Sequence, residues 1–307
     1  MKEVFIRAPG TIANLGPGFD IFALALENPY VELKMQLNDT NSVTIKNMCE
    51  EEDIPTCPEE NTGGLAVLDV LKQTDSHTGV GIEITKKMCI GSGLGSSGAC
   101  ASASVYGLNK LLGLNLGNNK MIEMASRGEV ASGGVAHADN VAGAMLGGFV
   151  VIKNSNPIDV IKIDVPEIPI VIGVLKKSQR TTRPLIPKSL SLEEVKEQLS
   201  YCARVVHSLM RGDLKEFGEA INKDYISEPT RSQSIPGYYD IKKKLLNEGA
   251  YGCNICGGGS SIFAICEMAR TNEIAEVMKG ELAKRGLENE TIITKANNEG
   301  VKEVSQT

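Results

Sequence analysis

Tryptophan is absent from this sequence of 307 residues, and aromatic residues make up only 4% of it. Long apolar runs are absent as well, because no segment approaches the roughly 18 residues that a transmembrane helix requires. The N-terminal stretch Met1–Arg7 turns polar again too soon for a secretory signal. We therefore expect a cytoplasmic protein with no membrane partner.

An excess of basic residues is also lacking. The formal net charge is −6, whereas a protein that binds nucleic acid normally carries a basic face that neutralises phosphates. We expect no nucleic-acid partner. The eight cysteines are scattered along the chain, which favours reduced thiols over a disulfide framework. Cys253 and Cys256 have C-x-x-C spacing, but no second such pair accompanies them, so we interpret them as structural rather than as zinc ligands.

The length allows two packed domains, because a single hydrophobic core usually stops growing at about 250 to 300 residues. Apolar runs and alternation predict strands at 4–7, 30–35, 80–84, 148–152, 170–175 and 261–266. Strands and helices mix without strict alternation, which indicates an α+β fold. The polar turn Asn154–Pro157 is the best linker candidate, and it gives domains at 1–156 and 157–307.

The clearest helix begins at Ser191, which forms a capping box with Glu194. Its apolar positions form one stripe along the helix, which consists of Val195, Leu199, Cys202, Val206 and Leu209. A second helix follows, and we expect Leu214, Phe217 and Ile221 on its inner face.

A glycine-rich stretch, Gly91-Ser92-Gly93-Leu94-Gly95-Ser96-Ser97-Gly98-Ala99, runs into a helical pattern. Exposed N–H groups and the positive end of the dipole at a helix N-terminus favour phosphate, and glycines let the backbone approach it closely. A dinucleotide-binding loop would need an acidic residue about 20 residues further on, but none occurs between Glu83 and Glu123. A P-loop would need Gly-Lys-Ser/Thr, and the sequence contains no Gly-Lys pair.

The stretch resembles the P-x-G-x-G-L-G-S-S-A loop of the GHMP kinase superfamily, with Cys89 in place of proline and Gly98 in place of alanine. Within that superfamily, the segment Arg7–Asp20 resembles the A-P-x-T-x-A-N-L-G-P-G-F-D opening of the homoserine kinases. Further segments resemble the same family: His137-Ala138-Asp139-Asn140-Val141-Ala142, Arg183-Pro184-Leu185-Ile186-Pro187, Glu228-Pro229-Thr230-Arg231 and, in degenerate form, Gly257-Gly258-Gly259-Ser260-Ser261.

The resemblance implies a two-domain GHMP kinase fold, with an N-terminal domain like ribosomal protein S5 domain 2 and a ferredoxin-like C-terminal domain. It also implies phosphorylation of the L-homoserine hydroxyl by ATP, within threonine biosynthesis, and allows a homodimer. The residues that it places at the nucleotide are Asn61, near the adenine, and Ile90, Gly91, Ser92, Gly93, Leu94, Gly95, Ser96, Ser97, Gly98 and Ala99, around the phosphates. Ser97 and Glu129 are the implied Mg²⁺ ligands.

By the same resemblance, Arg183 and Arg231 bind the substrate carboxylate, and Asn14 and Asp20 bind its ammonium. His137 and Asn140 are expected near the hydroxyl. Other GHMP kinases carry a catalytic aspartate where Asn140 stands, and asparagine cannot accept a proton. Asp139 should point away from Asn140 on a regular element. We therefore favour catalysis by Ser97, Glu129 and Asn140 without a side-chain base.

Two alternatives remain open from the residues. One is another GHMP small-molecule kinase, acting on a mevalonate-like compound or a sugar alcohol. The other is a non-catalytic member of the fold that binds ATP and senses a ligand.

Overall fold

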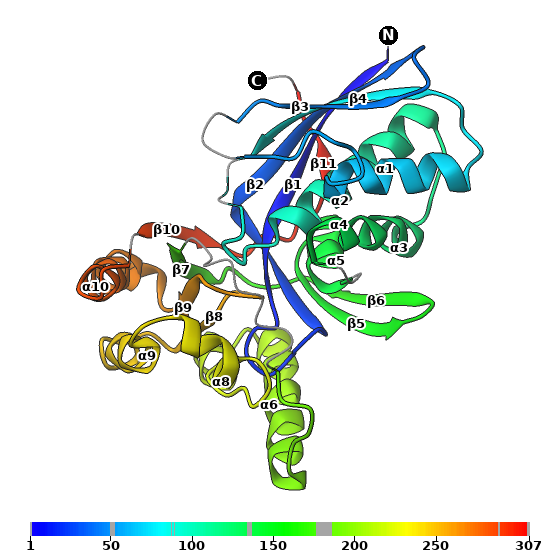
Figure 1. The fold of residues 1–307 in the computed structure, drawn as a ribbon. Coiled ribbons are helices and arrows are strands. Elements are labelled where there is room, and N and C mark those ends of the chain that lie inside the picture. Colours follow the sequence, from blue (N-terminus) through cyan, green and yellow to red (C-terminus); the bar gives the residue numbers. More distant parts are fainter. Residues whose placement is uncertain are drawn as a thin grey trace.

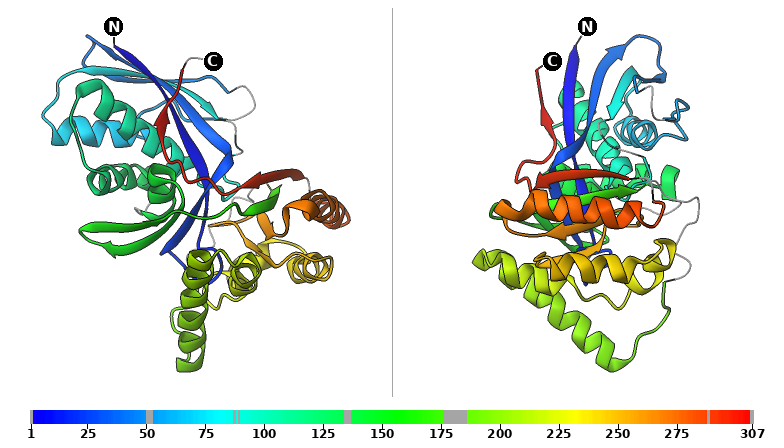
Figure 2. Two further views of the ribbon diagram at one scale, coloured as in Figure 1. Left: turned by 180° about the vertical axis from the view of Figure 1, so that it is seen from behind. Right: turned by 90° about the vertical axis from the view of Figure 1, so that its left-hand side faces the viewer.

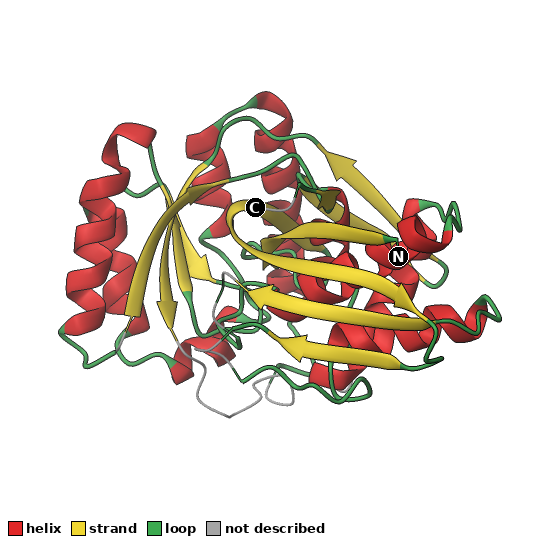
Figure 3. Cartoon of the chain, turned by 90° about the horizontal axis from the view of Figure 1, so that it is seen from above, coloured by secondary structure: helices red, strands yellow, loops and turns green. Residues whose placement is uncertain are grey.

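The computed structural model describes residues 2–49, 53–86, 88, 90–133, 137–175, 186–287 and 289–305. Two sheets organise these residues, and helices pack against both (Figure 1). Seen from above, the two groups of strands occupy different halves of the molecule (Figure 3). The mixture of helices and antiparallel strands confirms the predicted α+β class.

The larger sheet has seven strands in the order β11–β1–β2–β4–β3, with β5 and β6 attached through β2. Its strands are β1 (Glu3–Ala13), β2 (Phe22–Asn38), β3 (Val43–Asn47), β4 (Gly79–Lys86), β5 (Phe149–Ser155), β6 (Ile158–Ile163) and β11 (Lys302–Glu303). The long strand β2 pairs with β1 over most of its length and with β5 at its beginning. Because β1 and β2 reach into both halves of the molecule, they carry the residues around position 14 toward the second sheet.

Helices cover one face of this sheet (Figure 2). They are α1 (Thr62–Gln73), α2 (Ser96–Leu112), α3 (Asn118–Gly128), α4 (Val130–Gly133) and α5 (Asp139–Leu146). The small residues of α2 allow close packing: a Cβ on Gly107 would lie 2.5 Å from the sulfur of Met35 on β2. The α2 helix therefore lies against β1 and β2, and its N-terminus is fixed relative to both strands.

The smaller sheet is antiparallel, in the order β10–β7–β9–β8. Its strands are β7 (Pro169–Leu175), β8 (Gly252–Ile255), β9 (Ile262–Ile265) and β10 (Asn289–Lys295). Strand β7 is buried along its whole length because both of its faces are covered: Ile170 and Ile172 enter one core, while Val171 and Leu175 enter another. Side chains alternate between the faces of a strand.

The helices of the second half divide between these two cores. The helices α6 (Leu192–Arg211) and α7 (Leu214–Ile221) pack on one face, and α9 (Tyr238–Asn247) and α10 (Thr271–Ala283) on the other. A single-turn helix, α8 (Glu228–Arg231), and two short 3₁₀ turns, Ser232–Ser234 and Met268–Arg270, complete the order. No helix among the described residues is long and apolar enough to span a membrane.

The capping box of α6 is confirmed: the Ser191 side chain accepts from the Glu194 N–H, and the Glu194 carboxylate accepts from the Ser191 N–H. The predicted apolar stripe of α6 is buried only in part. Leu209 is buried, but Val195 is 37% exposed and Leu199 is 64% exposed. The buried side of α6 includes Gln198, Val205 and Leu209, and Leu199 lies to one side of it.

The six predicted strands all lie within or overlap β1, β2, β4, β5, β7 and β9. The polar turn at Asn156 connects β5 to β6, which pair with each other. Strand pairing therefore places β6, and also β11, with the larger sheet. The division into domains at residue 156 stays a prediction.

Candidate active site

The glycine loop lies at the N-terminus of α2 as predicted. Gly91, Gly93 and Gly95 all have positive φ, a conformation that costs glycine little and other residues more. A Cβ on Gly93 would lie 2.4 Å from the carbonyl oxygen of Cys256, so a second loop closes over the first. The buried Ser96 hydroxyl has no hydrogen-bond partner among the described residues. These features suit a site built to hold an anion.

The two predicted metal ligands meet beside this loop. The Ser97 hydroxyl donates to Oε2 of Glu129 over 3.1 Å, and Glu129 is only 6% exposed. Glu129 follows directly after α3, while Ser97 lies in the first turn of α2. Two hard oxygen ligands next to the positive end of a helix match the donors that Mg²⁺ takes when it is bound together with phosphates.

The segment Asn14–Asp20 forms the opposite wall. Asn14, Leu15 and Gly16 have positive φ in succession, which turns the chain sharply at the end of β1. The Asn14 side chain donates to the carbonyl of Gly257 over 3.3 Å and accepts from the backbone N–H of Asp20 over 3.1 Å. The side chains of Gln198 and Cys202 on α6 donate to the carbonyl of Pro17. Contacts with Gly257 on one side and with α6 on the other therefore fix the Asn14–Asp20 turn.

The side chain of Asp20 faces His137. One carboxylate oxygen lies 3.9 Å from Nδ1 of His137, an ion pair when the imidazole is protonated. Both residues line the same cleft. The structure thus brings together two residues that are separated by more than 100 positions in the sequence.

Asn140 lies in the first turn of α5 and contacts Thr11 of β1. The Thr11 hydroxyl donates to Oδ1 of Asn140 over 2.7 Å. The backbone N–H and the side-chain NH₂ of Asn140 donate to Oδ1 of Asp139, over 2.8 Å and 3.4 Å. The expectation that Asp139 points away is therefore wrong, because at a helix N-terminus a carboxylate can fold back onto the free N–H groups.

The sequence interpretation missed Thr11. The residue belongs to the N-terminal motif, but nothing in its local sequence places it next to position 140, which lies 129 residues away. A Cβ on Gly95 would lie 2.1 Å from the Thr11 hydroxyl and 2.8 Å from Oδ1 of Asn140. Thr11 therefore links Asn140 to the glycine loop.

Asn61 lines the cleft and also caps the start of a helix. It is the N-cap of α1, where its Oδ1 accepts from the N–H groups of Gly63 and Gly64, and its NH₂ donates to the carbonyl of Pro55. A direct contact of Asn61 with adenine stays a prediction.

Arg231 enters the cleft from α8. It is 5% exposed, its guanidinium donates to the carbonyl of Gly257 over 2.5 Å, and it lies 5.5 Å from the ring centre of Phe19. The other predicted arginine, Arg183, lies outside the described residues.

A cleft of about 500 Å³ joins these groups between the two halves of the molecule. Its lining includes the following predicted residues: Asn14, Asp20, Asn61, Ile90, Gly91, Ser92, Gly93, Gly95, Ser96, Ser97, Glu129, His137, Asn140 and Arg231. Three members of the predicted phosphate loop do not line it: Leu94 is buried in the core, and Gly98 and Ala99 lie inside the first turns of α2.

Comparison with known proteins gives the same assignment for both halves. Residues 64–148 match the family model "GHMP kinases N terminal domain", and residues 205–284 match "GHMP kinases C terminal". A curated homoserine kinase of Methanococcus vannielii is 37% identical over 282 residues, which cover 91% of this chain and 93% of that protein. The chain belongs to the homoserine kinase family of the GHMP kinases.

Solved structures agree with this family membership. The crystal structure of homoserine kinase from Cytophaga hutchinsonii has a TM-score of 0.91 and 34% sequence identity, and the match covers 99% of this chain and 98% of that one. The crystal structure of L. major mevalonate kinase in complex with R-mevalonate has a TM-score of 0.75 at 16% identity, which shows a shared fold only.

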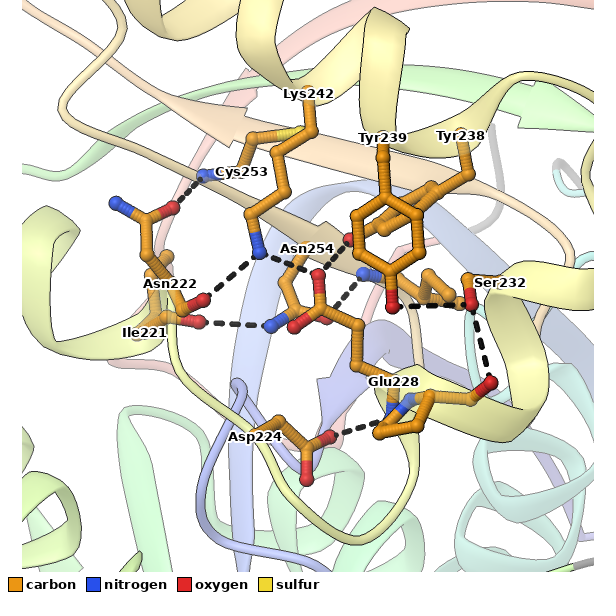
Figure 4. Close-up of polar contacts among 12 residues, drawn as sticks. Ile221, Asn222, Asp224, Glu228, Ser232, Tyr238, Tyr239, Lys242, Cys253 and Asn254 are labelled. Carbon is orange, nitrogen blue, oxygen red and sulfur yellow. Dashed lines mark hydrogen bonds and ion pairs between the residues drawn. The ribbon is translucent and has the colours of Figure 1, made fainter. Parts of the chain in front are cut away.

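A buried polar network supports α8, the helix that carries Arg231, in this member of the homoserine kinase family (Figure 4). Asp224 accepts from the backbone N–H groups of Ile226, Ser227 and Glu228, and so fixes the start of α8. Glu228 accepts from the Tyr238 hydroxyl over 2.7 Å and forms an ion pair with Lys242. Burial raises the pKa of the Glu228 carboxyl, and the contacts with Lys242 and Tyr238 oppose that change.

The C-x-x-C pair lies next to this network. Cys253 and Cys256 are fully buried, and burial raises the pKa of the Cys253 thiol to about 12 and that of Cys256 well above its usual value. Thiols buried in apolar surroundings in this way are unreactive. No group of three or more potential metal-binding side chains occurs among the residues that the structure describes.

Proposed function

We propose that this protein transfers the γ-phosphoryl group of ATP to the hydroxyl of L-homoserine. The observation that carries the proposal is the arrangement of the cleft: an anion-binding loop with the Ser97–Glu129 pair faces a buried arginine and the Asn14–Asp20 turn. Phosphoryl transfer requires positioning and charge stabilisation far more than covalent help from the protein. The names of the relatives support homoserine as the acceptor.

The glycine loop suits the phosphates of ATP. Bound ATP with Mg²⁺ would supply the phosphoryl group and neutralise its charge. The Ser96 hydroxyl, which has no hydrogen-bond partner among the described residues, offers a donor to a phosphate oxygen. The positive φ of Gly91, Gly93 and Gly95 shapes the loop so that its backbone can approach the phosphates. Ser97 and Glu129 would hold the metal ion.

The opposite wall suits an amino acid that has a hydroxyl side chain. The Arg231 guanidinium can form a charge-assisted pair with the substrate carboxylate, and Arg183 is proposed as its companion. The carboxylate of Asp20 and the side chain of Asn14 suit the ammonium. His137 and Asn140 remain for the hydroxyl. A cytoplasmic location and a homodimer also remain proposals.

Asn140 orients the acceptor in this proposal and does not remove its proton. Thr11 donates to Oδ1 of Asn140, so the NH₂ of the amide is directed toward Asp139 and the cleft. That side of the amide can donate to an oxygen of the substrate or of the phosphate but cannot accept a proton. We propose that a phosphate oxygen or water takes the hydroxyl proton.

Replacing Thr11 by valine should lower kcat about tenfold, because one hydrogen bond that orients a reacting group is lost. The KM values for ATP and homoserine should change less than threefold. Steady-state kinetics measure both, and Thr11→Ser, which retains the hydroxyl, should restore most of the activity. Since Thr11 is fully buried, thermal unfolding of each variant is the control. An unchanged kcat in a folded Thr11→Val variant would contradict this role.

The acceptor is tested directly by measuring ADP release with Mg·ATP and each candidate compound. We expect rapid release with L-homoserine and at least about a hundredfold lower kcat/KM with mevalonate or galactose, because neither offers the amino-acid carboxylate and ammonium together. Equal activity with mevalonate would refute homoserine as the substrate, but it would not contradict membership of the GHMP kinase superfamily. Binding of ATP and homoserine without ADP release would favour the sensor alternative.

A further inference from the structure

Gln198 of α6 is a buried polar residue to which the function proposed above assigns no role. Its side chain is 6% exposed, and it is not among the described residues that line the cleft. Both ends of its amide are hydrogen-bonded: Nε2 donates to the carbonyl of Pro17 over 2.6 Å, and Oε1 accepts from the backbone N–H of Tyr225 over 2.9 Å. The opposite orientation of the amide would leave both partners unsatisfied, so the side chain is fixed in this one.

The two partners of Gln198 belong to the two segments that bind opposite charges of the substrate in the proposed function. Pro17 lies in the Asn14–Asp20 turn, which is proposed for the ammonium and which lies against α6 (Figure 1). Tyr225 opens the segment that leads into α8 and Arg231, which is proposed for the carboxylate. One buried amide therefore joins the ammonium-binding turn to the carboxylate-binding helix.

The segment after Tyr225 carries the position of this amide to Arg231. The Asp224 carboxylate accepts from three successive backbone N–H groups at the start of α8. The N–H of Arg231 donates to the carbonyl of Ser227 over 2.9 Å, within the same short helix. Because these hydrogen bonds hold the segment as one unit, a shift of Tyr225 also moves Arg231.

The turn is held together in the same way. The carbonyl of Asn14 accepts from the N–H of Gly18 over 3.0 Å, and its side chain accepts from the N–H of Asp20. Pro17 lies between these bonded positions. The Cys202 thiol, one helical turn after Gln198, also donates to the Pro17 carbonyl, over 3.2 Å. The α6 helix therefore sets the position of the whole turn.

A second connection joins the same two segments on the cleft side. The carbonyl of Gly257 accepts from the Asn14 side chain and from the Arg231 guanidinium. Both of these side chains are proposed to contact the substrate, so this connection is shared with the ligand. The connection through Gln198 contains no group that the substrate requires, and it can hold the two segments apart at one distance whether the cleft is empty or filled.

We propose that Gln198 is a positioning residue that sets the distance between the ammonium-binding turn and Arg231. This distance favours an acceptor in which ammonium and carboxylate are attached to the same carbon atom, as in an α-amino acid. The inference rests on the proposed amino-acid acceptor and assigns part of its selectivity to a residue outside the cleft. Binding groups that are already held at the right separation cost less to order when the ligand binds.

Gln198→Met tests the proposal, because methionine retains the length of the side chain and removes both hydrogen bonds. The KM for homoserine should rise about tenfold, since a displacement of about 1 Å is enough to weaken an oriented contact strongly, and the KM for ATP should change less than about twofold. Ser208→Ala is the matched control. Ser208 is buried on the same helix and donates to the carbonyl of Val205, so its loss should change neither KM.

Acceptors that lack one charge separate positioning from a general loss of stability. γ-Hydroxybutyrate has the carboxylate and the hydroxyl but no ammonium, and homoserine amide has the ammonium but no carboxylate. Each contacts only one of the two segments by charge, so Gln198→Met should lower kcat/KM for either one less than about twofold. A merely structural defect would lower kcat/KM for all three acceptors by the same factor. That result would overturn the proposal, and so would an unchanged KM for homoserine.

Hydrogen exchange followed by mass spectrometry tests the same connection without turnover. In folded Gln198→Met, peptides from the Asn14–Asp20 turn and from α8 should both exchange faster, whereas peptides from the glycine loop should not change. Faster exchange near Tyr225 alone would overturn the proposal, because the two segments would then move independently. A wild-type protein that releases no ADP with homoserine would refute the proposed function and the selectivity assigned to Gln198. The exchange result would still decide whether Gln198 holds the two segments together.

Discussion

Glu129→Gln and Ser97→Ala are each expected to lower kcat by about a hundredfold or more. The Ser97 hydroxyl and the Glu129 carboxylate are 3.1 Å apart at the N-terminus of α2, where the proposed Mg²⁺ and γ-phosphate would bind. Removing one preorganised electrostatic contact to a reacting group typically costs a hundredfold to a thousandfold. Glutamine retains the shape of Glu129 but loses the charge, so this variant separates charge from packing.

Steady-state kinetics at several Mg²⁺ concentrations measure these losses, and calorimetry measures the affinity for Mg·ATP independently of turnover. The matched control is Ser102→Ala. Ser102 lies on the same helix and is fully buried, but its hydroxyl donates to the carbonyl of Val141 and does not line the cleft. Near-normal turnover of either test variant at saturating Mg²⁺ would refute its assignment as a metal ligand.

Arg231→Ala is expected to raise the KM for homoserine by roughly 30-fold to several thousandfold and to change the KM for ATP little. Arg231 is 5% exposed inside the cleft, and removing one partner of a desolvated charge pair costs about 2 to 5 kcal/mol. Arg231→Lys should restore only part of the affinity, because an ammonium keeps the charge but not the planar pair of donors.

A neutral analogue separates recognition from folding, since Arg231 also holds the carbonyl of Gly257. Homoserine with its carboxylate converted to an amide should bind the wild-type protein poorly and lose little more in Arg231→Ala. Arg270→Ala, on the exposed surface, is the control substitution. If the amide binds as well as homoserine, the arginine does not recognise the carboxylate.

Several parts of the fold and of the site could be predicted from the sequence because their signals are local. The glycines of the loop at 91–95 adopt positive φ, and a helix begins directly after the loop. About ten consecutive residues therefore specify the anion-binding site. The capping box at Ser191 and Glu194 depends on two residues three positions apart. The resemblance to the family predicted three further site residues, Glu129, Asn140 and Arg231, and all three line the cleft.

Contacts between residues far apart in the sequence could be identified only from the tertiary structure. Thr11 forms a hydrogen bond with Asn140, which is 129 positions away in the sequence, and Asn14 forms one with Gly257, which is 243 positions away. No periodicity or motif encodes such contacts, because they depend on how β1 and the two sheets pack. The burial of the Glu228–Lys242 pair behind Arg231 is a further example, since both residues are of types that are usually exposed.

The α6 helix shows the same division within one element. Its sequence determined that a helix begins after Ser191 and that one side of it is apolar, because both properties follow from spacing along the chain. Only the packed structure decided which apolar side chains enter the core. Val205 and Leu209 are buried and Leu199 is exposed, although its neighbour Gln198 is buried, because burial depends on which side of the helix the other elements contact.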